Sequence, residues 1–278
     1  MDYTLLPSLR VEDYEYPGEK NALALVKKVP VLDQVMGAYL KYIHQIHTVP
    51  EAQGDFYRVT KETCPEIYDL YQTALNRLCI AEEYPLYIKA SFDYNAYTTG
   101  GNAPYVVLHS SMVKNLSEKE LLFVIGHELG HVKSGHLIYV SMVEHLNAII
   151  ANLPVAGNLI MSTGLHYLLM NWRRMHEFTA DRAGVIAAGD VDSGIHALGK
   201  LLGVSENIPW VNFSVEDLKK QNDTFEEFNK DFTTKLLCAL QIMESSHPWT
   251  VNRIKELDRW NTSGEYGEFL AKYGVNIE

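Results

Sequence analysis

Residues 116–136 read LSEKELLFVIGHELGHVKSGH and contain the run His127-Glu128-Leu129-Gly130-His131. Apolar residues recur through this stretch at helical spacing. Ser117 followed three residues later by Glu120 is the pattern of a capping box at a helix start. The stretch therefore predicts a buried helix that carries the His-Glu-x-x-His run near its middle.

The spacing of the two histidines indicates a metal site. Residues four apart lie on one face of a helix, so His127 and His131 can bind one Zn²⁺ together. Glu128 then lies beside the open coordination position, where a carboxylate serves as general base. The alternative is a chance pair, but a buried imidazole without a partner is costly. We therefore favour a zinc site in which the metal acidifies a bound water.

A third ligand is required, and His136 is one candidate. It would extend the motif to a longer metalloprotease pattern, but Ser134 and Leu137 stand where that pattern requires glycine and histidine. We expect His136 to pack at the helix end next to Gly135 instead.

Glu177 is the other candidate for the third ligand. Asp181 follows it by one helical turn, so both carboxylates lie on one face of a predicted helix. Asp181 could accept the second N–H of a ligand histidine and fix its tautomer. A helix with solvated charges is the alternative interpretation of this segment.

Three motifs in this order resemble the M48 family of gluzincin metallopeptidases: His127-Glu128-x-x-His131, Glu177-x-x-x-Asp181 and Ser246-His247-Pro248-x-x-x-x-Arg253-Ile254. The resemblance covers roughly residues 84–260. It implies an α+β, mainly helical, zincin-like fold with one Zn²⁺ per chain. It also implies that His127, His131 and Glu177 are zinc ligands, that Glu128 is the catalytic base and that Asp181 orients a ligand. By the same resemblance, His247 would stabilise the oxyanion, although it could also serve as a helix-start residue before Pro248.

A hairpin is expected just upstream of the zinc helix. Residues 92–108 form two extended runs around Gly100-Gly101-Asn102. Gluzincins use an edge strand here to bind a peptide by strand addition. Asn95, Ala96 and Tyr97 are similar to a stretch that contacts the substrate backbone in such enzymes. An ordinary sheet hairpin is the alternative.

Composition limits the class of protein. The chain of 278 residues is 47% hydrophobic, and we expect one compact unit: an N-terminal extension, 1–60, packed on a metallopeptidase domain, 61–278. A net charge of -11 without a basic run excludes a nucleic-acid binder. Three scattered cysteines suit a reducing compartment, as buried thiols or, for Cys64 or Cys79, as an inhibitory zinc ligand. No signal-peptide pattern is visible, so we expect a cytoplasmic protein.

Residues 145–172 carry no charged side chain. Polar residues, proline and glycine interrupt them, so we favour two short helices joined near residues 154–157, packed as a wall or lid of the cleft. A shallow peripheral membrane contact stays open. Further helices are expected over 28–47, 63–82, 192–202, 224–245 and 247–260, with a small sheet near 85–110.

The favoured function is a zinc-dependent endopeptidase that acts on peptides or unfolded proteins. Two alternatives remain: a non-catalytic, zinc-stabilised binding or chaperone-like protein of the same fold, and a hydrolase of small non-peptide substrates. The sequence determines neither the substrate nor the oligomeric state.

Overall fold

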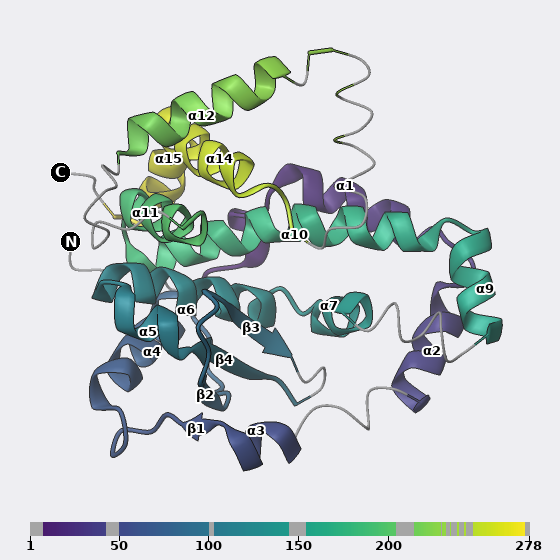
Figure 1. Ribbon diagram of the computed structural model, residues 1–278, viewed down its shortest axis with the longest axis horizontal. Coiled ribbons are helices and arrows are strands. Elements are labelled where there is room, and N and C mark those ends of the chain that lie inside the picture. Colours follow the sequence, from purple (N-terminus) through teal and green to yellow (C-terminus); the bar gives the residue numbers. More distant parts are fainter. Residues whose placement is uncertain are drawn as a thin grey trace.

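The computed structural model describes residues 8–42, 50–99, 103–144, 154–203, 214–228 and 247–275, with single positions between 230 and 242. Two helices organise it: α6 (Glu118–Lys133) and α10 (Leu165–Ala188). Figure 1 shows α10 running along the length of the molecule, with α6 beside it and a small sheet below α6. The expected α+β, mainly helical class is confirmed.

Local sequence determines both ends of α6. Ser117 is its N-cap: Glu120 Oε2 accepts a hydrogen bond from Ser117 N (2.6 Å), and Ser117 Oγ accepts one from Glu120 N (3.4 Å). The predicted capping box is therefore confirmed. The helix ends at Lys133, because Gly135 has a φ of +70° that continues no right-handed helix. The His-Glu-x-x-His run consequently lies in the second half of α6, not near its middle as predicted.

Small residues let α6 and α10 approach closely. A Cβ on Gly126 would lie 2.2 Å from Ala187 Cβ, and a Cβ on Gly130 would lie 2.7 Å from Ala183 Cβ. A Cβ on Gly184 would likewise lie 2.7 Å from the ring of Phe123. Because no side chain separates the two backbones at these points, residues on the facing sides of α6 and α10 come within reach of one another.

The sheet lies against α6 and has the order β1-β2-β4-β3. β1 (Tyr57–Arg58) pairs with β2 (Leu86–Lys89), and β2 pairs in parallel with the fully buried β4 (Tyr105–His109). β3 (Ala96–Thr99) pairs antiparallel with β4, with Ala96 opposite Leu108, and forms one edge. The predicted hairpin is confirmed in both strands; its turn at 100–102 lies outside the described residues.

The remaining helices surround this centre. They are η1 (Val11–Asp13), α1 (Pro17–Val26), α2 (Leu32–Tyr42), α3 (Pro50–Asp55), α4 (Pro65–Arg77), α5 (Ser110–Asn115), α7 (Leu137–Glu144), α9 (Pro154–Ser162), α11 (Val191–Leu201), α12 (Val215–Phe228), α14 (Thr250–Thr262) and α15 (Glu265–Lys272). In Figure 1, α12, α14 and α15 lie on the side of α10 away from the sheet.

Several predicted helix boundaries were wrong. The helix expected over 28–47 begins only at Leu32, after a turn that contains Pro30. The one expected over 63–82 ends at Arg77, because Cys79 adopts a φ of +51°. α12 begins nine residues before the expected 224 and ends at Phe228; most of 229–245 lies outside the described residues.

The charge-free segment also differs from its prediction. α9 begins at Pro154, within the predicted junction of 154–157, and a further break that was not predicted comes at Gly164, which has a φ of +70°. α9 and the first part of α10 pack with α1, α2 and α7 in a separate apolar cluster that includes Val35, Ile160 and Trp172. Residues 145–153 lie outside the described part. No described helix is long and apolar enough to cross a membrane.

We predict that Gly126→Ala destabilises the protein by about 1–3 kcal/mol, because the new methyl group would force α6 and α10 apart. Denaturant unfolding measures the change. Gly37→Ala in α2 is the matched control: nothing lies within 4 Å of its Cβ position, so stability should stay equal or rise. Equal stability of Gly126→Ala and wild type would contradict the close packing.

Candidate active site

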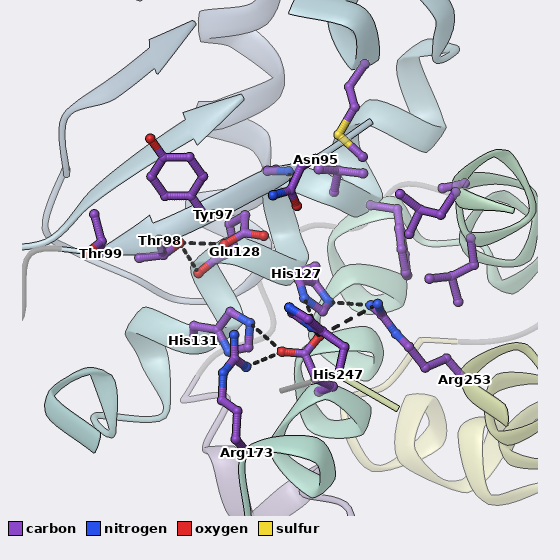
Figure 2. Close-up of a pocket in the computed structure, with 18 of the residues that line it drawn as sticks. Asn95, Tyr97, Thr98, Thr99, His127, Glu128, His131, Arg173, His247 and Arg253 are labelled. Atoms are coloured by element: carbon purple, nitrogen blue, oxygen red, sulfur yellow. Dashed lines mark hydrogen bonds and ion pairs between the residues drawn. The ribbon is translucent and has the colours of Figure 1, made fainter. Parts of the chain in front are cut away.

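Three buried side chains converge between α6 and α10. His127 Nε2 lies 3.5 Å from Glu177 Oε2, and His131 Nε2 lies 3.4 Å from Glu177 Oε1. One ligand atom from each residue lies within 4.8 Å of the other two. Figure 2 shows the two histidines facing the same point from α6. The structure therefore brings together the three residues that the sequence analysis proposed as ligands.

This group fits a divalent metal ion. Two imidazole nitrogens and a carboxylate form a donor set that zinc favours. Glu177 is 0% exposed, yet its Oε2 makes no well-aligned hydrogen bond among the described residues, although His247 Nδ1 lies 3.0 Å away. A buried carboxylate oxygen in that state is costly unless a cation occupies the site.

Asp181 fixes the orientation of His127. Asp181 Oδ1 lies 3.0 Å from His127 Nδ1, so Nδ1 carries a proton and Nε2, which faces Glu177, is the nitrogen left for a metal. Burial acts to lower the pKa of His127, but Asp181 and Glu177 outweigh it and raise the pKa to about 9, so a metal would displace the Nε2 proton on binding. This is the position predicted for a residue that orients a ligand.

Arg253 holds Asp181 in turn, a role that the sequence analysis missed. Its Nε donates to Asp181 Oδ2 (2.8 Å) and its Nη2 donates to Asp181 Oδ1 (2.6 Å). Burial would raise the pKa of Asp181, but Arg253 lowers it below its usual value, so the carboxylate stays charged. A basic residue six positions after His247 was visible in the sequence, but its partner was not.

Arg173 is a second residue whose place was missed. It is buried and pairs with Glu177 Oε1 from one turn earlier on α10. Burial and the nearby Arg173 charge hold the pKa of His131 well below its usual value. His131 is therefore neutral, which is the state that a metal ligand requires.

Glu128 lies beside the three-residue group. Burial raises the pKa of its carboxyl group. Thr98 Oγ1, on β3, lies 2.8 Å from Glu128 Oε2 (Figure 2). Thr98 lies one residue beyond the stretch predicted to bind substrate, and nothing in the sequence linked it to Glu128.

His247 reaches the group from the segment before α14. Its side chain is 53% exposed, and Nδ1 lies 3.0 Å from Glu177 Oε2. It is thus the solvent-facing member of the site. Pro248 and the start of α14 at Thr250 follow it, so the helix-start interpretation remains compatible with this position.

A cavity of about 360 Å³ opens onto these residues. β3 and Asn95 form one wall, which includes the predicted Asn95, Ala96 and Tyr97. The apolar part of the lining consists of Met112, Phe123, Val124, Ala197, Leu198 and Leu201. No described residue of 154–172 lines the cavity, so the predicted wall or lid was wrong there.

Neither Cys64 nor Cys79 lines the cavity, and both pack against the main core. His136 also lies apart from the three-residue group; its Nδ1 is 3.7 Å from Glu19 Oε1. The structure thus gives no support to a cysteine or to His136 as the further ligand in this cavity.

Comparison with known proteins identifies the family. The profile of peptidase family M48 matches residues 78–261, so the chain belongs to peptidase family M48. The plastoglobule-localized metallopeptidase 48 of Arabidopsis thaliana is 29% identical, over 96% of this chain and 78% of its own length. A protease HtpX homolog of Ralstonia nicotianae is 24% identical, over 75% and 78%. Protease HtpX homolog 2 of Methanosarcina mazei is 26% identical, over 72% and 74%.

These relationships confirm the resemblance described above. They make the protein a metal-dependent protease. The family implies a divalent metal, and the cluster of His127, His131 and Glu177 offers donors that suit one.

We predict that Asp181→Asn weakens metal binding about ten- to a hundredfold, because His127 loses its charged partner and buried Arg253 loses the carboxylate to which it donates two hydrogen bonds. Competition with a chelator measures the affinity. Asp223→Asn, at an exposed position of α12, is the control and should bind metal like wild type. Equal affinity in the two variants would contradict the orienting role of Asp181.

Proposed function

We propose that this protein is a zinc-dependent endopeptidase. The observation that carries the proposal is the group of His127, His131 and Glu177 at the floor of a cavity that Glu128 and an edge strand also border. Zinc bound there would polarise the scissile carbonyl and acidify the attacking water. Each remaining step belongs to a side chain of the protein.

Glu128 acts as general base and then as general acid in this proposal. It takes the proton of the attacking water and delivers a proton to the leaving amine. The raised pKa that burial gives its carboxyl group suits both roles. Thr98 keeps the carboxylate in place through the contact at Oε2.

His247 is proposed to stabilise the oxyanion of the tetrahedral intermediate. Its imidazole lies at the solvent-facing side of Glu177, where a substrate carbonyl would approach. Donors placed where negative charge develops contribute strongly to catalysis. Because it is half-exposed, His247 can meet an incoming peptide.

The substrate is proposed to be an extended peptide or a segment of an unfolded protein. β3 is an edge strand next to the cavity, and such an edge binds peptides through main-chain hydrogen bonds. Asn95, Ala96 and Tyr97 would contact the backbone of the peptide. The apolar wall around Phe123 and Leu198 favours a large apolar side chain next to the scissile bond.

The alternative is a zinc-stabilised binding protein without turnover. It accounts for the metal group and the edge strand. It gives no reason, however, for a buried carboxylate of raised pKa at Glu128, which costs stability and serves no binding role. The proposal therefore favours catalysis over binding alone.

Glu128→Gln should abolish peptide cleavage, with a loss of at least about a hundredfold, while zinc content stays near that of wild type. Glu128 is not a proposed ligand, so the variant separates chemistry from metal binding. The assay uses casein and short peptides with a central phenylalanine or leucine, with metal analysis in parallel. Full activity in Glu128→Gln would overturn the proposal, and zinc-loaded wild type that cleaves none of these substrates would favour the binding protein.

We also propose peripheral contact with an uncharged lipid surface through α9. Val155 is 77% exposed and Met161 49% exposed, and the described residues 154–172 carry no charge. Figure 1 places α9 at one end of the molecule. The Arabidopsis relative is named as plastoglobule-localized, which agrees with an apolar surface of this kind. The net charge of -11 disfavours anionic lipid.

Wild type is expected to float with vesicles of neutral phospholipid. The double variant Val155→Asp/Met161→Asp is expected to remain in the dense fraction, because both new charges would have to enter the lipid interface. Flotation through a density gradient measures this. Leu202→Asp, at an exposed apolar position just after α11, is the control. Wild type that never floats would contradict the proposed contact.

A further inference from the structure

A second group of histidine and carboxylate side chains lies behind the first, on the far side of His131. It consists of Glu19 from α1, His136 from the turn after α6, and His176 from α10. His176 Nδ1 lies 2.6 Å from Glu19 Oε1, and His136 Nδ1 lies 3.7 Å from the same oxygen. One ligand atom of each lies within 4.8 Å of the other two.

Burial and ring packing hold the side chains of this group in place. Glu19 is 1% exposed and His176 is 0% exposed. Trp172 holds both imidazoles: it stacks on His176 with ring centroids 5.1 Å apart, and it meets His136 edge to face at 5.8 Å. The rings are therefore fixed with both Nδ1 atoms directed at one carboxylate oxygen.

Both nitrogens of His176 have a polar neighbour. Ser134 Oγ, which donates to His131 O, lies 3.3 Å from Nε2, and Glu19 Oε1 lies 2.6 Å from Nδ1. In the absence of a metal, a proton on Nδ1 makes the contact with Glu19 a hydrogen bond. A divalent cation bound to Nδ1 and Oε1 would replace that proton.

The neighbouring contacts leave Glu19 Oε1 facing the two imidazoles. Thr179 Oγ1 donates to Glu19 Oε2 and accepts a hydrogen bond from Tyr16 N (3.0 Å), so Oε2 is satisfied on the other side. His136 Nδ1 has no hydrogen-bond partner among the described residues. Both Nδ1 atoms thus lie near the same carboxylate oxygen, and one ion could bind all three atoms.

We propose that Glu19, His136 and His176 bind a second zinc-type divalent cation that ties α1 to α6 and α10. Two imidazoles and a carboxylate are the donor types zinc favours. Tetrahedral donors at zinc distances lie about 3.3 Å apart, so Glu19 and His176 would separate by less than about 1 Å on binding. The ion would be structural, because no described residue of this group lines the cavity.

The consequence is that the N-terminal segment contributes to the metal-bearing core. Glu19 lies upstream of residues 78–261, which the family profile matches. Binding at Glu19 would fasten α1 across α10, with which it already packs. It would also fix His176, whose ring lies 4.8 Å from that of His131.

Metal counting on the full chain tests the proposal. Wild type, after zinc loading and exhaustive dialysis, should retain two zinc ions per chain, and His136→Ala and Glu19→Gln should each retain one. His136→Ala is the main variant because this partly exposed residue of a turn, unlike buried His176, can be removed with little effect on folding. His196→Ala, a histidine of α11 outside both groups, is the control and should retain both ions.

His127→Ala separates this proposal from the proposed function, because it removes the first site and should keep one ion that raises the unfolding temperature. If wild type retains one zinc ion and His136→Ala retains it too, the second site is overturned and the endopeptidase proposal stands. If wild type retains one ion that His136→Ala loses and His127→Ala keeps, the second site is supported and the first is overturned. Two ions in His136→Ala and Glu19→Gln would overturn the assignment of these ligands.

Discussion

The close contact of α6 with α10 is the constraint on which the site depends. Gly126 and Gly130 alternate along α6 with the histidines, and they face Ala183 and Ala187 on α10. Without side chains between the backbones, Glu177 comes within 3.5 Å of imidazoles that are about fifty residues earlier in the chain. A bulkier contact would separate the three donors by more than a metal ion can span. Metal binding is therefore a property of how two helices pack as much as of the residues that donate.

A chain of charges then sets the protonation of the site. Arg253 keeps Asp181 ionised, Asp181 holds the proton of His127 on Nδ1, and the opposite nitrogen is left for a metal. The arginine comes from α14, on the side of α10 away from the sheet (Figure 1). Elements that are remote in sequence thus control one imidazole. The residues that control this imidazole are therefore spread over more than a hundred residues of the chain, from His127 to Arg253.

The sequence predicted the parts of the structure that short-range patterns encode. The capping box at Ser117, the hairpin strands around 96–108 and the helical faces of His127, His131, Glu177 and Asp181 follow from spacing. The roles of Arg253, Thr98 and Arg173 could not be predicted, because each depends on which distant segment lies opposite. The end of the helix expected over 63–82 was misplaced because Cys79 adopts a positive φ. The break at Gly164, which also has a positive φ, was missed for the same reason.

The contact between Thr98 and Glu128 links two parts of the cavity that are usually considered separately. Thr98 belongs to β3, so the carboxylate beside the metal group is held by the strand that borders the cavity. Any ligand that pulls this strand outward or shifts its register also moves Glu128. Occupancy of the β3 edge and the position of the Glu128 carboxylate are therefore coupled. A molecule that fills the cavity but displaces β3 also displaces Glu128.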